Sequence, residues 1–292
     1  MRIGLFTPAG NPFVTAEYLR VLGPLVDARG FHSLWVAEHV VLFDDYASRY
    51  PYAADGKIPV GGEAGLLDPF DTLAFLAAVT TRIRLGTGIC LVPQRNPVYT
   101  AKDVSTVDWL SGGRFDFGVG IGWLEEEFAA LGVPFARRAE RCRAYLEVMR
   151  RLWCDPVSAY DGELYRLPAC RQYPKPLQQP HPPIHFGGES DAALRRVADL
   201  GQGWYPFSIE PAELAKRLSD LEPLLARRGR RREDIEVSIC PYMREVDFDA
   251  VRRYRDAGAD QVIVLLLASS VDSLRRRVDD LTEKILQPAR AL

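Results

Sequence analysis

The chain has no long apolar stretch, no excess of charge and no paired cysteines. No segment approaches the ~18 uninterrupted apolar residues of a transmembrane helix. The opening residues, MRIGLFTP, hold one basic residue and too short an apolar run for a signal peptide. The net charge of −2 gives no electrostatic basis for binding nucleic acid or an acidic membrane. We therefore expect a cytoplasmic protein without a nucleic-acid or membrane partner.

The spacing of the cysteines and histidines indicates neither a disulfide framework nor a metal site. The five cysteines lie apart, without a CxxC pair, at Cys90, Cys142, Cys154, Cys170 and Cys240. An odd, dispersed set is typical of reduced thiols in the cytosol. His181 and His185 are close in sequence, but no cysteine or carboxylate completes a metal set. No metal site is predicted.

The chain does contain short β-branched or aromatic segments that alternate with helical periodicity. We expect strands at 2–8, 33–39, 83–92, 115–122, 183–188, 203–207, 235–241 and 261–267, and the clearest helices at 138–153 and 212–228. This alternation fits a closed barrel or an open doubly wound sheet. A dinucleotide-binding open sheet would carry GxGxxG after its first strand, where this chain reads TPAGNPF. The sequence therefore predicts an α/β fold, one (β/α)8 TIM barrel domain over residues 1–292.

Two segments are longer than ordinary barrel connections. Residues 40–67 follow the second strand, and residues 154–182 precede the fifth. The first leaves from the strand ends where barrel active sites lie, so we expect it to act as a lid. The second contains QYPKPLQQPHPPI, and we expect it to cover the surface in an extended, proline-stiffened form.

Two titratable residues, Glu38 and His39, end the second predicted strand. In a barrel this position places both at the catalytic mouth. An imidazole there can pass a proton near neutral pH, and a carboxylate can accept an N–H from a ligand. The alternative is a helix-capping acid beside a histidine bonded to the backbone.

Glycines mark three further candidate positions. GTGI (86–89) lies inside a strand, where glycine indicates a bulge for a cofactor ring or space for a core side chain. GVGIG (118–122) ends the next strand at a rim that a flat molecule can approach. GGES (187–190) opens a helix with Ser190 at the N-cap, which favours phosphate or a plain tight turn.

Charged residues near these glycines allow two interpretations each. Arg95 follows the third strand and either meets a polyanionic ligand tail or has no role. The acids Glu125, Glu126 and Glu127 follow Trp123, and at least two of them are explained by favourable placement in a first helical turn.

Several segments together resemble the bacterial luciferase-like monooxygenase superfamily, and most closely its branch that depends on the deazaflavin coenzyme F420. They are WVAEH (35–39), LGTGICLVPQRNP (85–97), AKDVSTVDWLSGGRFDFGVGIGWLEEEFAALG (101–132), YPKPLQQPHPPIHFGGES (173–190) and VADLGQGW (197–204). They follow the family's order over roughly residues 1–210, whereas the C-terminal third matches only in its strand–helix pattern.

The resemblance implies a TIM barrel, a homodimer and a cofactor in the barrel mouth. In F420 enzymes of the family the ring rests against a bulge in the third strand that holds a non-proline cis peptide, which by position is Gly88–Ile89. Glu38 would orient the ring and His39 would act as acid or base toward the substrate. The remaining cofactor-binding residues implied are Leu91, Gly122, Trp123 and Glu126, and Gly187, Gly188, Glu189 and Ser190 for phosphate.

The function implied is hydride transfer between F420 and a small organic substrate. One alternative is an FMN-dependent monooxygenase that receives reduced flavin from a separate reductase and uses O2. Luciferases proper place an arginine for the flavin phosphate where this chain has Ile121. Some F420 dehydrogenases have a glutamate that acts as an acid near position 123, where this chain has the indole of Trp123 instead. A second alternative is a non-catalytic flavin-binding barrel, which would need neither His39 nor glycine-rich rims.

Overall fold

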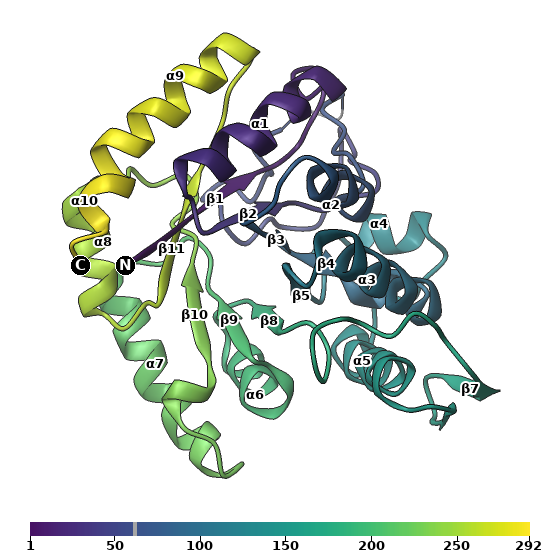
Figure 1. Ribbon diagram of the computed structural model, residues 1–292. Coiled ribbons are helices and arrows are strands. Elements are labelled where there is room, and N and C mark those ends of the chain that lie inside the picture. The colour runs from purple at the N-terminus through teal and green to yellow at the C-terminus, as the bar shows by residue number, and fades with distance from the viewer. Residues whose placement is uncertain (61–62) are drawn as a thin grey trace.

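Eight parallel strands close into a barrel in the computed structural model, which describes residues 1–60 and 63–292 (Figure 1). The barrel strands are β1 (Arg2–Thr7), β2 (Ser33–Val36), β3 (Arg84–Thr87), β5 (Phe115–Gly120), β8 (Ile184–Gly187), β9 (Gly203–Tyr205), β10 (Glu236–Ile239) and β11 (Gln261–Leu265). Neighbouring strands pair in chain order, and β11 pairs with β1 to complete the ring. The predicted (β/α)8 fold is confirmed.

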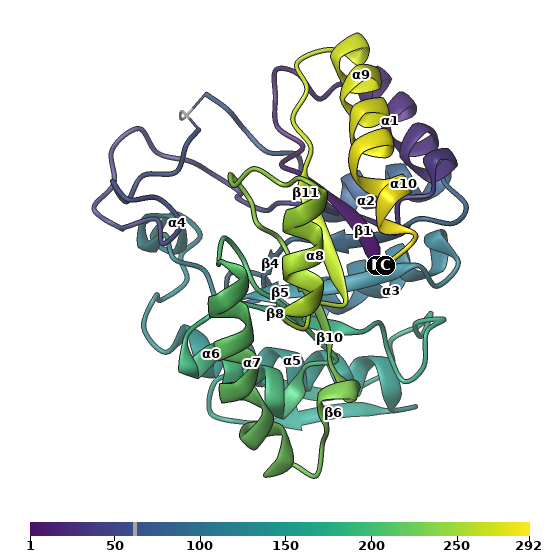
Figure 2. The same ribbon diagram turned by 90° about the vertical axis from the view of Figure 1, so that its left-hand side faces the viewer.

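Helices surround the barrel and cover its outer face (Figures 1 and 2). They are α1 (Ala16–Arg29), α2 (Pro69–Ala78), α3 (Pro97–Ser111), α4 (Glu125–Ala130), α5 (Arg138–Cys154), α6 (Asp191–Leu200), α7 (Pro211–Ala226), α8 (Phe248–Asp256), α9 (Val271–Leu281) and α10 (Gln287–Ala289). Most strand residues are buried on both faces because side chains fill the barrel interior and the helices cover the outside. The buried strand residues include polar ones that pair with one another, such as Ser33 with Gln261. None of the helices in the described part of the chain combines the length and the apolarity of a membrane span.

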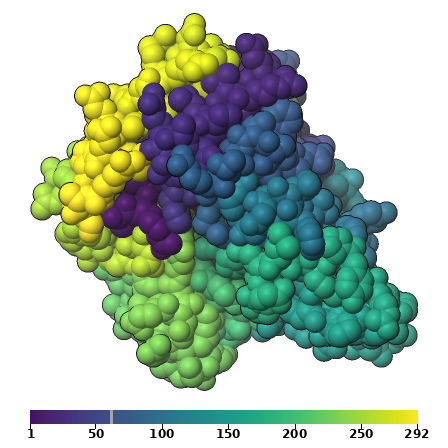
Figure 3. Space-filling model, in the orientation of Figure 1, coloured from purple at the N-terminus to yellow at the C-terminus, as the bar shows by residue number. Residues whose placement is uncertain are grey.

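The two ends of the chain meet beside the barrel. The terminal ammonium of Met1 donates to the carbonyl of Ala289 at 3.0 Å. In the space-filling view the N-terminal residues and the C-terminal helices pack side by side (Figure 3). A π-helical turn, Thr282–Leu286, joins α9 to α10 at this closure.

The third predicted strand, 83–92, is interrupted. β3 ends at Thr87 and a short strand, β4 (Cys90–Leu91), resumes the pairing with β5. Between them lies the cis peptide Gly88–Ile89, at the position that the family resemblance implies. The predicted bulge in this strand is confirmed, while Gly86 in the same segment makes room for the Trp35 ring, which a Cβ would approach within 2.4 Å.

The bulge explains the glycines of the neighbouring strands. A Cβ at Gly120 or Gly187 would stand 2.2 or 2.6 Å from Cδ1 of Ile89, and a Cβ at Gly118 would stand 1.8 Å from the carbonyl oxygen of Thr87. We expected the rim at 118–122 to be open to a flat molecule. Instead, Gly118 and Gly120 first accommodate the interrupted strand.

The long segment 154–182 is only partly as expected. Its first half forms a β-hairpin, β6 (Ser158–Asp161) and β7 (Arg166–Cys170), which the proline-based prediction missed. The Asp161-Gly162 pair at the turn is the sequence signal for a hairpin. Residues 171–183 form no helix or strand, but they bend over 177–182 where an extended chain was predicted, and the peptide bonds before Pro174 and Pro180 are cis.

Replacing Gly118 by alanine tests the steric demand of the interrupted strand. The added methyl group would overlap a backbone carbonyl that cannot rotate away, so we expect Gly118→Ala to lower the free energy of unfolding by about 3 kcal/mol or more. Gly132→Ala is the control, because a Cβ at Gly132 would meet nothing within 4 Å. Only the positive φ of 68° disfavours alanine there, so we expect this variant to lower the free energy of unfolding by about 1 kcal/mol. Equal losses in urea unfolding would contradict the steric explanation.

Candidate active site

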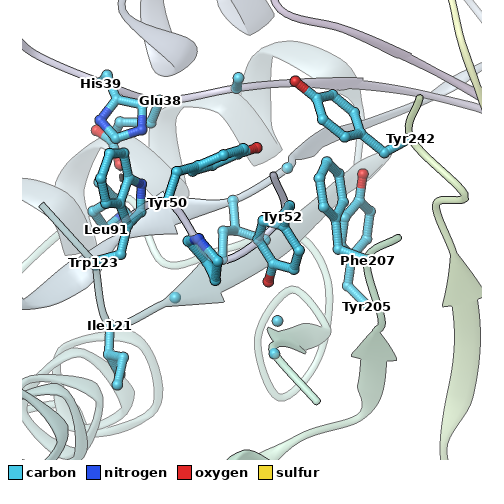
Figure 4. Close-up of a pocket in the computed structure, with 18 of the residues that line it drawn as sticks. Glu38, His39, Tyr50, Tyr52, Leu91, Ile121, Trp123, Tyr205, Phe207 and Tyr242 are labelled. Carbon is cyan, nitrogen blue, oxygen red and sulfur yellow. Dashed lines mark hydrogen bonds between the residues drawn. The ribbon is translucent and has the colours of Figure 1, made fainter. Parts of the chain in front are cut away.

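A cavity of about 410 Å³ lies at the C-terminal ends of the barrel strands (Figure 4). Most predicted site residues line it: Glu38, His39, Gly88, Ile89, Leu91, Gly122, Trp123, Gly187, Gly188, Glu189 and Ser190. The loop after β2 lines it as well, through Tyr50, Pro51, Tyr52, Ile58, Val60 and Leu66. The loop therefore lies where a lid was predicted, except that residues 61–62 of the predicted lid fall outside the described residues.

His39 is held by Glu127, which the sequence analysis assigned to no role. Nδ1 of His39 lies 3.1 Å from Oε2 of Glu127, and the Glu127 side chain is fully buried. Glu127 also accepts the backbone N–H of Val40 at 2.7 Å and the amide of Gln94 at 3.0 Å. The imidazole is thus fixed in place by a carboxylate that also accepts the backbone N–H groups of Val40 and Val41 and the amide of Gln94.

These donors keep Glu127 ionised. Burial pushes its pKa up, but the hydrogen bond and charge of His39, together with Gln94 and the Val40 N–H, bring the pKa below its ordinary value. Because an ionised carboxylate only accepts hydrogen bonds, Nδ1 of His39 must carry the proton. Nε2 is then the ring nitrogen that can exchange a proton with a molecule in the cavity.

Glu38 lies at the cavity wall, and its carboxylate is engaged within the protein. One oxygen accepts the backbone N–H of Leu91 at 2.5 Å and the other accepts the guanidinium of Arg95 at 2.5 Å. Arg95 also pairs with Asp68 at 2.6 Å and lies over the ring of Phe70. The structure therefore gives Arg95 the role of neutralising Glu38, and the pair fixes the chain that follows the interrupted strand.

The three consecutive glutamates of α4 all contact the lid loop, Glu125 and Glu126 at residues 47–48 and Glu127 at its start. Glu125 donates its backbone N–H to the Ser48 hydroxyl, and the Glu126 carboxylate accepts the backbone N–H groups of Ala47 and Ser48. Glu126 does not line the cavity, so the structure places it away from the position expected for a residue facing the cofactor. Glu127, the neighbour in sequence, is the acid that turns inward.

The N-terminus of α6 forms another wall. Ser190 caps the helix by accepting the N–H of Ala193 at 3.2 Å, as predicted. From the second turn of the same helix, Arg196 reaches the cavity lining, and its buried Nε has no hydrogen-bond partner among the described residues. Unpaired helix N–H groups and an unpaired guanidinium nitrogen on one wall fit a phosphate group.

Glu189 occupies this wall with an unusual protonation state. Burial raises the pKa of its carboxyl to about 7, although the N–H of Phe207 at 2.7 Å and the hydroxyl of Tyr52 at 3.4 Å act in the opposite direction. A neutral carboxylic acid here opposes an approaching anion less than a carboxylate would. The same side chain connects α6 to the lid through Tyr52.

Residues that the sequence analysis missed lie opposite His39. Figure 4 shows His39 and Trp123 at one side of the cavity, and Phe207, Tyr205 and Tyr242 at the other. Tyr205 is the last residue of β9, and Phe207 and Tyr242 follow β9 and β10, where the sequence carries no motif. An aromatic or polar residue directly after a barrel strand is the general signal that would have selected them.

Replacing Glu189 by glutamine tests the raised pKa. Because the folded-state pKa of about 7 exceeds the ordinary 4.5, the folded protein binds the proton more tightly, and the free energy of unfolding falls as pH rises from about 4.5 to 7. Glu189→Gln keeps an acceptor for Phe207 and removes this dependence. We expect the variant to gain up to about 3 kcal/mol at pH 8 and nothing at pH 4 in urea unfolding. A constant difference between the two pH values would contradict the assignment.

Comparison with known proteins agrees with this architecture. The luciferase-like monooxygenase family model matches residues 1–283. The uncharacterised protein Rv0953c of Mycobacterium tuberculosis is 31% identical over 264 residues, which cover 89% of this chain and 91% of that protein. An FMNH2-dependent dimethylsulfone monooxygenase of Pseudomonas putida is 35% identical over 133 residues, 44% of this chain and 36% of that protein.

A solved structure shares the fold over nearly the whole chain. The coenzyme F420-dependent tetrahydromethanopterin reductase of Methanopyrus kandleri superposes with a TM-score of 0.75 at 16% identity, covering 98% of both chains. At this identity the likeness concerns the fold alone. The shared fold agrees with the family match and with the mycobacterial relative. The chain belongs to the luciferase-like monooxygenase family.

Proposed function

We propose that this oxidoreductase transfers a hydride between coenzyme F420 and a small organic substrate, with His39 as the proton donor or acceptor. The observation that carries the proposal is the His39–Glu127 pair, which opens onto a cavity lined by glycines and closed by an aromatic loop. A deazaflavin, when bound, supplies a carbon that gives or takes a hydride. The protein has to supply orientation and a proton.

The cavity offers separate places for the two ends of such a cofactor. Its floor consists of Ile89 and the backbone of Gly120 and Gly122. The Ile89 side chain fills the space beside Gly120, so a flat ring would lie against Ile89 and the glycine backbone. The phosphate end would meet the N–H groups at Gly188–Ser190 and the unpaired Nε of Arg196. Burying a guanidinium without an anion is costly, which supports an anionic ligand at this wall.

His39 moves a proton to or from the substrate in this proposal. Glu127 holds Nδ1–H, so Nε2 accepts a proton when the substrate is oxidised and returns one when it is reduced. The carboxylate of Glu127 stabilises the imidazolium that forms in between. Its burial strengthens this effect because few water molecules compete for the charge.

The alternative is an FMN-dependent monooxygenase, which the partial similarity to the dimethylsulfone enzyme favours. Against it stands Ile121, an apolar side chain of the cavity lining at the place where luciferases carry a phosphate-binding arginine. The proposal therefore chooses F420, and direct binding decides between the two cofactors.

Cofactor binding is the first test. We expect the purified chain to bind F420 with a Kd in the micromolar range or below, and at least about tenfold tighter than FMN, by isothermal titration calorimetry. Micromolar binding of FMN without binding of F420 would overturn the choice.

The phosphate wall has a matched pair of variants. Arg196→Met removes the buried guanidinium, and we expect a loss of about 10- to 100-fold in affinity for the cofactor that binds. Arg195→Met changes the exposed neighbour on the same helix and should leave the affinity within about threefold. Equal effects of both would show that the buried guanidinium does not hold the phosphate.

The protonation state of His39 is a second, independent test. Neutral imidazole free in water favours the Nε2–H form, whereas the contact with Glu127 requires Nδ1–H. The signal of His39 in the ¹⁵N spectrum of the histidine-labelled protein is identified by its absence in His39→Asn. We expect this signal to be that of the Nδ1–H form. Once a substrate is known, this variant should lower turnover by about 10²- to 10⁴-fold with the cofactor still bound. An Nε2–H signal, or full turnover, would refute the role.

A further inference from the structure

The lid loop and the strand ends together form a continuous series of aromatic rings around one half of the cavity. Tyr50 and Tyr52 of the loop lie 5.5 Å apart between ring centroids, and Tyr52 lies 4.8 Å from Phe207. Phe207 in turn lies 4.5 Å from Tyr242 and 5.8 Å from Phe6. We call these five rings, Phe6, Tyr50, Tyr52, Phe207 and Tyr242, the aromatic belt.

The belt begins beside the proposed proton donor. The centroid of Tyr50 lies 5.2 Å from that of Trp123, and the indole lies 5.8 Å from the imidazole of His39. A molecule in contact with the Tyr50 end of the belt therefore lies beside Trp123, next to His39. Figure 4 shows Tyr50 and Tyr52 between His39 and Trp123 on one side and Phe207 and Tyr242 on the other.

Charge is scarce on this side of the cavity. Among the described lining residues, the acidic or basic side chains besides His39 are Glu38, Glu189 and Arg196. Glu38 is neutralised by Arg95, and Arg196 lies on the α6 wall assigned to phosphate. Glu189 is turned toward the N–H of Phe207 and the hydroxyl of Tyr52. The belt therefore presents aromatic ring surfaces and tyrosine hydroxyls to a bound ligand.

This environment disfavours both signs of charge. An anion would lose its hydration against electron-rich ring faces, without a free cation on that side. A cation is bound best where several ring faces converge. In the belt, however, three ring pairs meet edge to face, with interplanar angles of 77° for Tyr50–Tyr52, 64° for Tyr52–Phe207 and 84° for Phe6–Phe207, and the rings of Phe207 and Tyr242 pack against each other at 34°. Neighbouring edges thus take up part of the faces that a cation would need.

We propose that the substrate is an uncharged molecule with an aromatic or other flat unsaturated ring system, held by the aromatic belt with its reacting group toward His39. Flat rings gain offset or edge contacts with the belt as well as burial of apolar area. Tyrosine hydroxyls can bond a carbonyl or hydroxyl group on the same molecule. This inference rests on the proposed function for the orientation toward His39, but the binding preference of the belt does not depend on the cofactor.

Three molecules that share a naphthalene ring and differ in charge test the proposal. They are 2-naphthol, 2-naphthoate and the (2-naphthyl)trimethylammonium ion, titrated into the full chain at pH 7 by calorimetry, with and without F420. We expect 2-naphthol to bind at least about tenfold more tightly than either charged probe. Equal or tighter binding of a charged probe, or no binding of 2-naphthol, would overturn the proposal.

Variants locate the binding. Phe207→Ala should weaken 2-naphthol binding by about tenfold or more, and Phe207→Leu, which keeps apolar volume, should weaken it less. Tyr99→Ala is the control, because Tyr99 is 76% exposed on α3 and should leave the affinity unchanged. Equal affinity in Phe207→Ala and the unmodified chain would place the probe elsewhere and refute the belt as its site.

The two proposals can fail separately. If 2-naphthol binds and Phe207→Ala loses it while F420 does not bind, the proposed function is wrong and the preference of the belt stands. If F420 binds and 2-naphthol does not, the assignment of the substrate class is wrong and the cofactor assignment stands.

Discussion

The buried carboxylate of Glu127 is the contact on which the arrangement of the site depends. It accepts hydrogen bonds from the ring of His39 at the end of β2, from the backbone where the lid loop begins, and from Gln94 after β4. Residues 39–40, Gln94 and α4, which are distant from one another in sequence, are therefore joined by one charge. Removing that charge would leave several buried donors without an acceptor, and such groups cost about 1–3 kcal/mol each. The orientation of the imidazole and the start of the lid are thus parts of the same structure.

Steric demand at Ile89 shapes the opposite side of the cavity. Its side chain fills the space that Gly120 and Gly187 leave, so glycines on two neighbouring strands depend on one residue of the third. The ion pair of Glu38 with Arg95 then fixes the chain just beyond the interruption. The floor of the cavity is consequently rigid, whereas its cover comes from a loop without helix or strand between residues 40 and 60.

The sequence was sufficient for the features that depend on local pattern. Strand alternation predicted the barrel, glycines within a strand predicted the interruption at 88–89, and a serine before a helix predicted the cap at Ser190. Features that depend on rotation about a short helix or on distant segments were missed. The sequence of three consecutive glutamates does not reveal that Glu127 turns inward. Packing against the rest of the protein determines which side of the six-residue helix α4 faces the interior. Arg95 resembled a ligand contact because Glu38 and Asp68 come near it only in the folded chain.

The lid loop is attached in two ways that differ in kind. At its base, α4 binds Val40, Ala47 and Ser48 through backbone N–H groups and a hydroxyl, contacts that hardly depend on the identity of the loop residues. Further along, Tyr52 reaches Glu189 through its side chain. Mutations after residue 49 can therefore alter the cover of the cavity while the loop base and His39 keep their geometry. During divergence within the family, such a chain can change the surface that covers its cavity and still retain the His39–Glu127 pair.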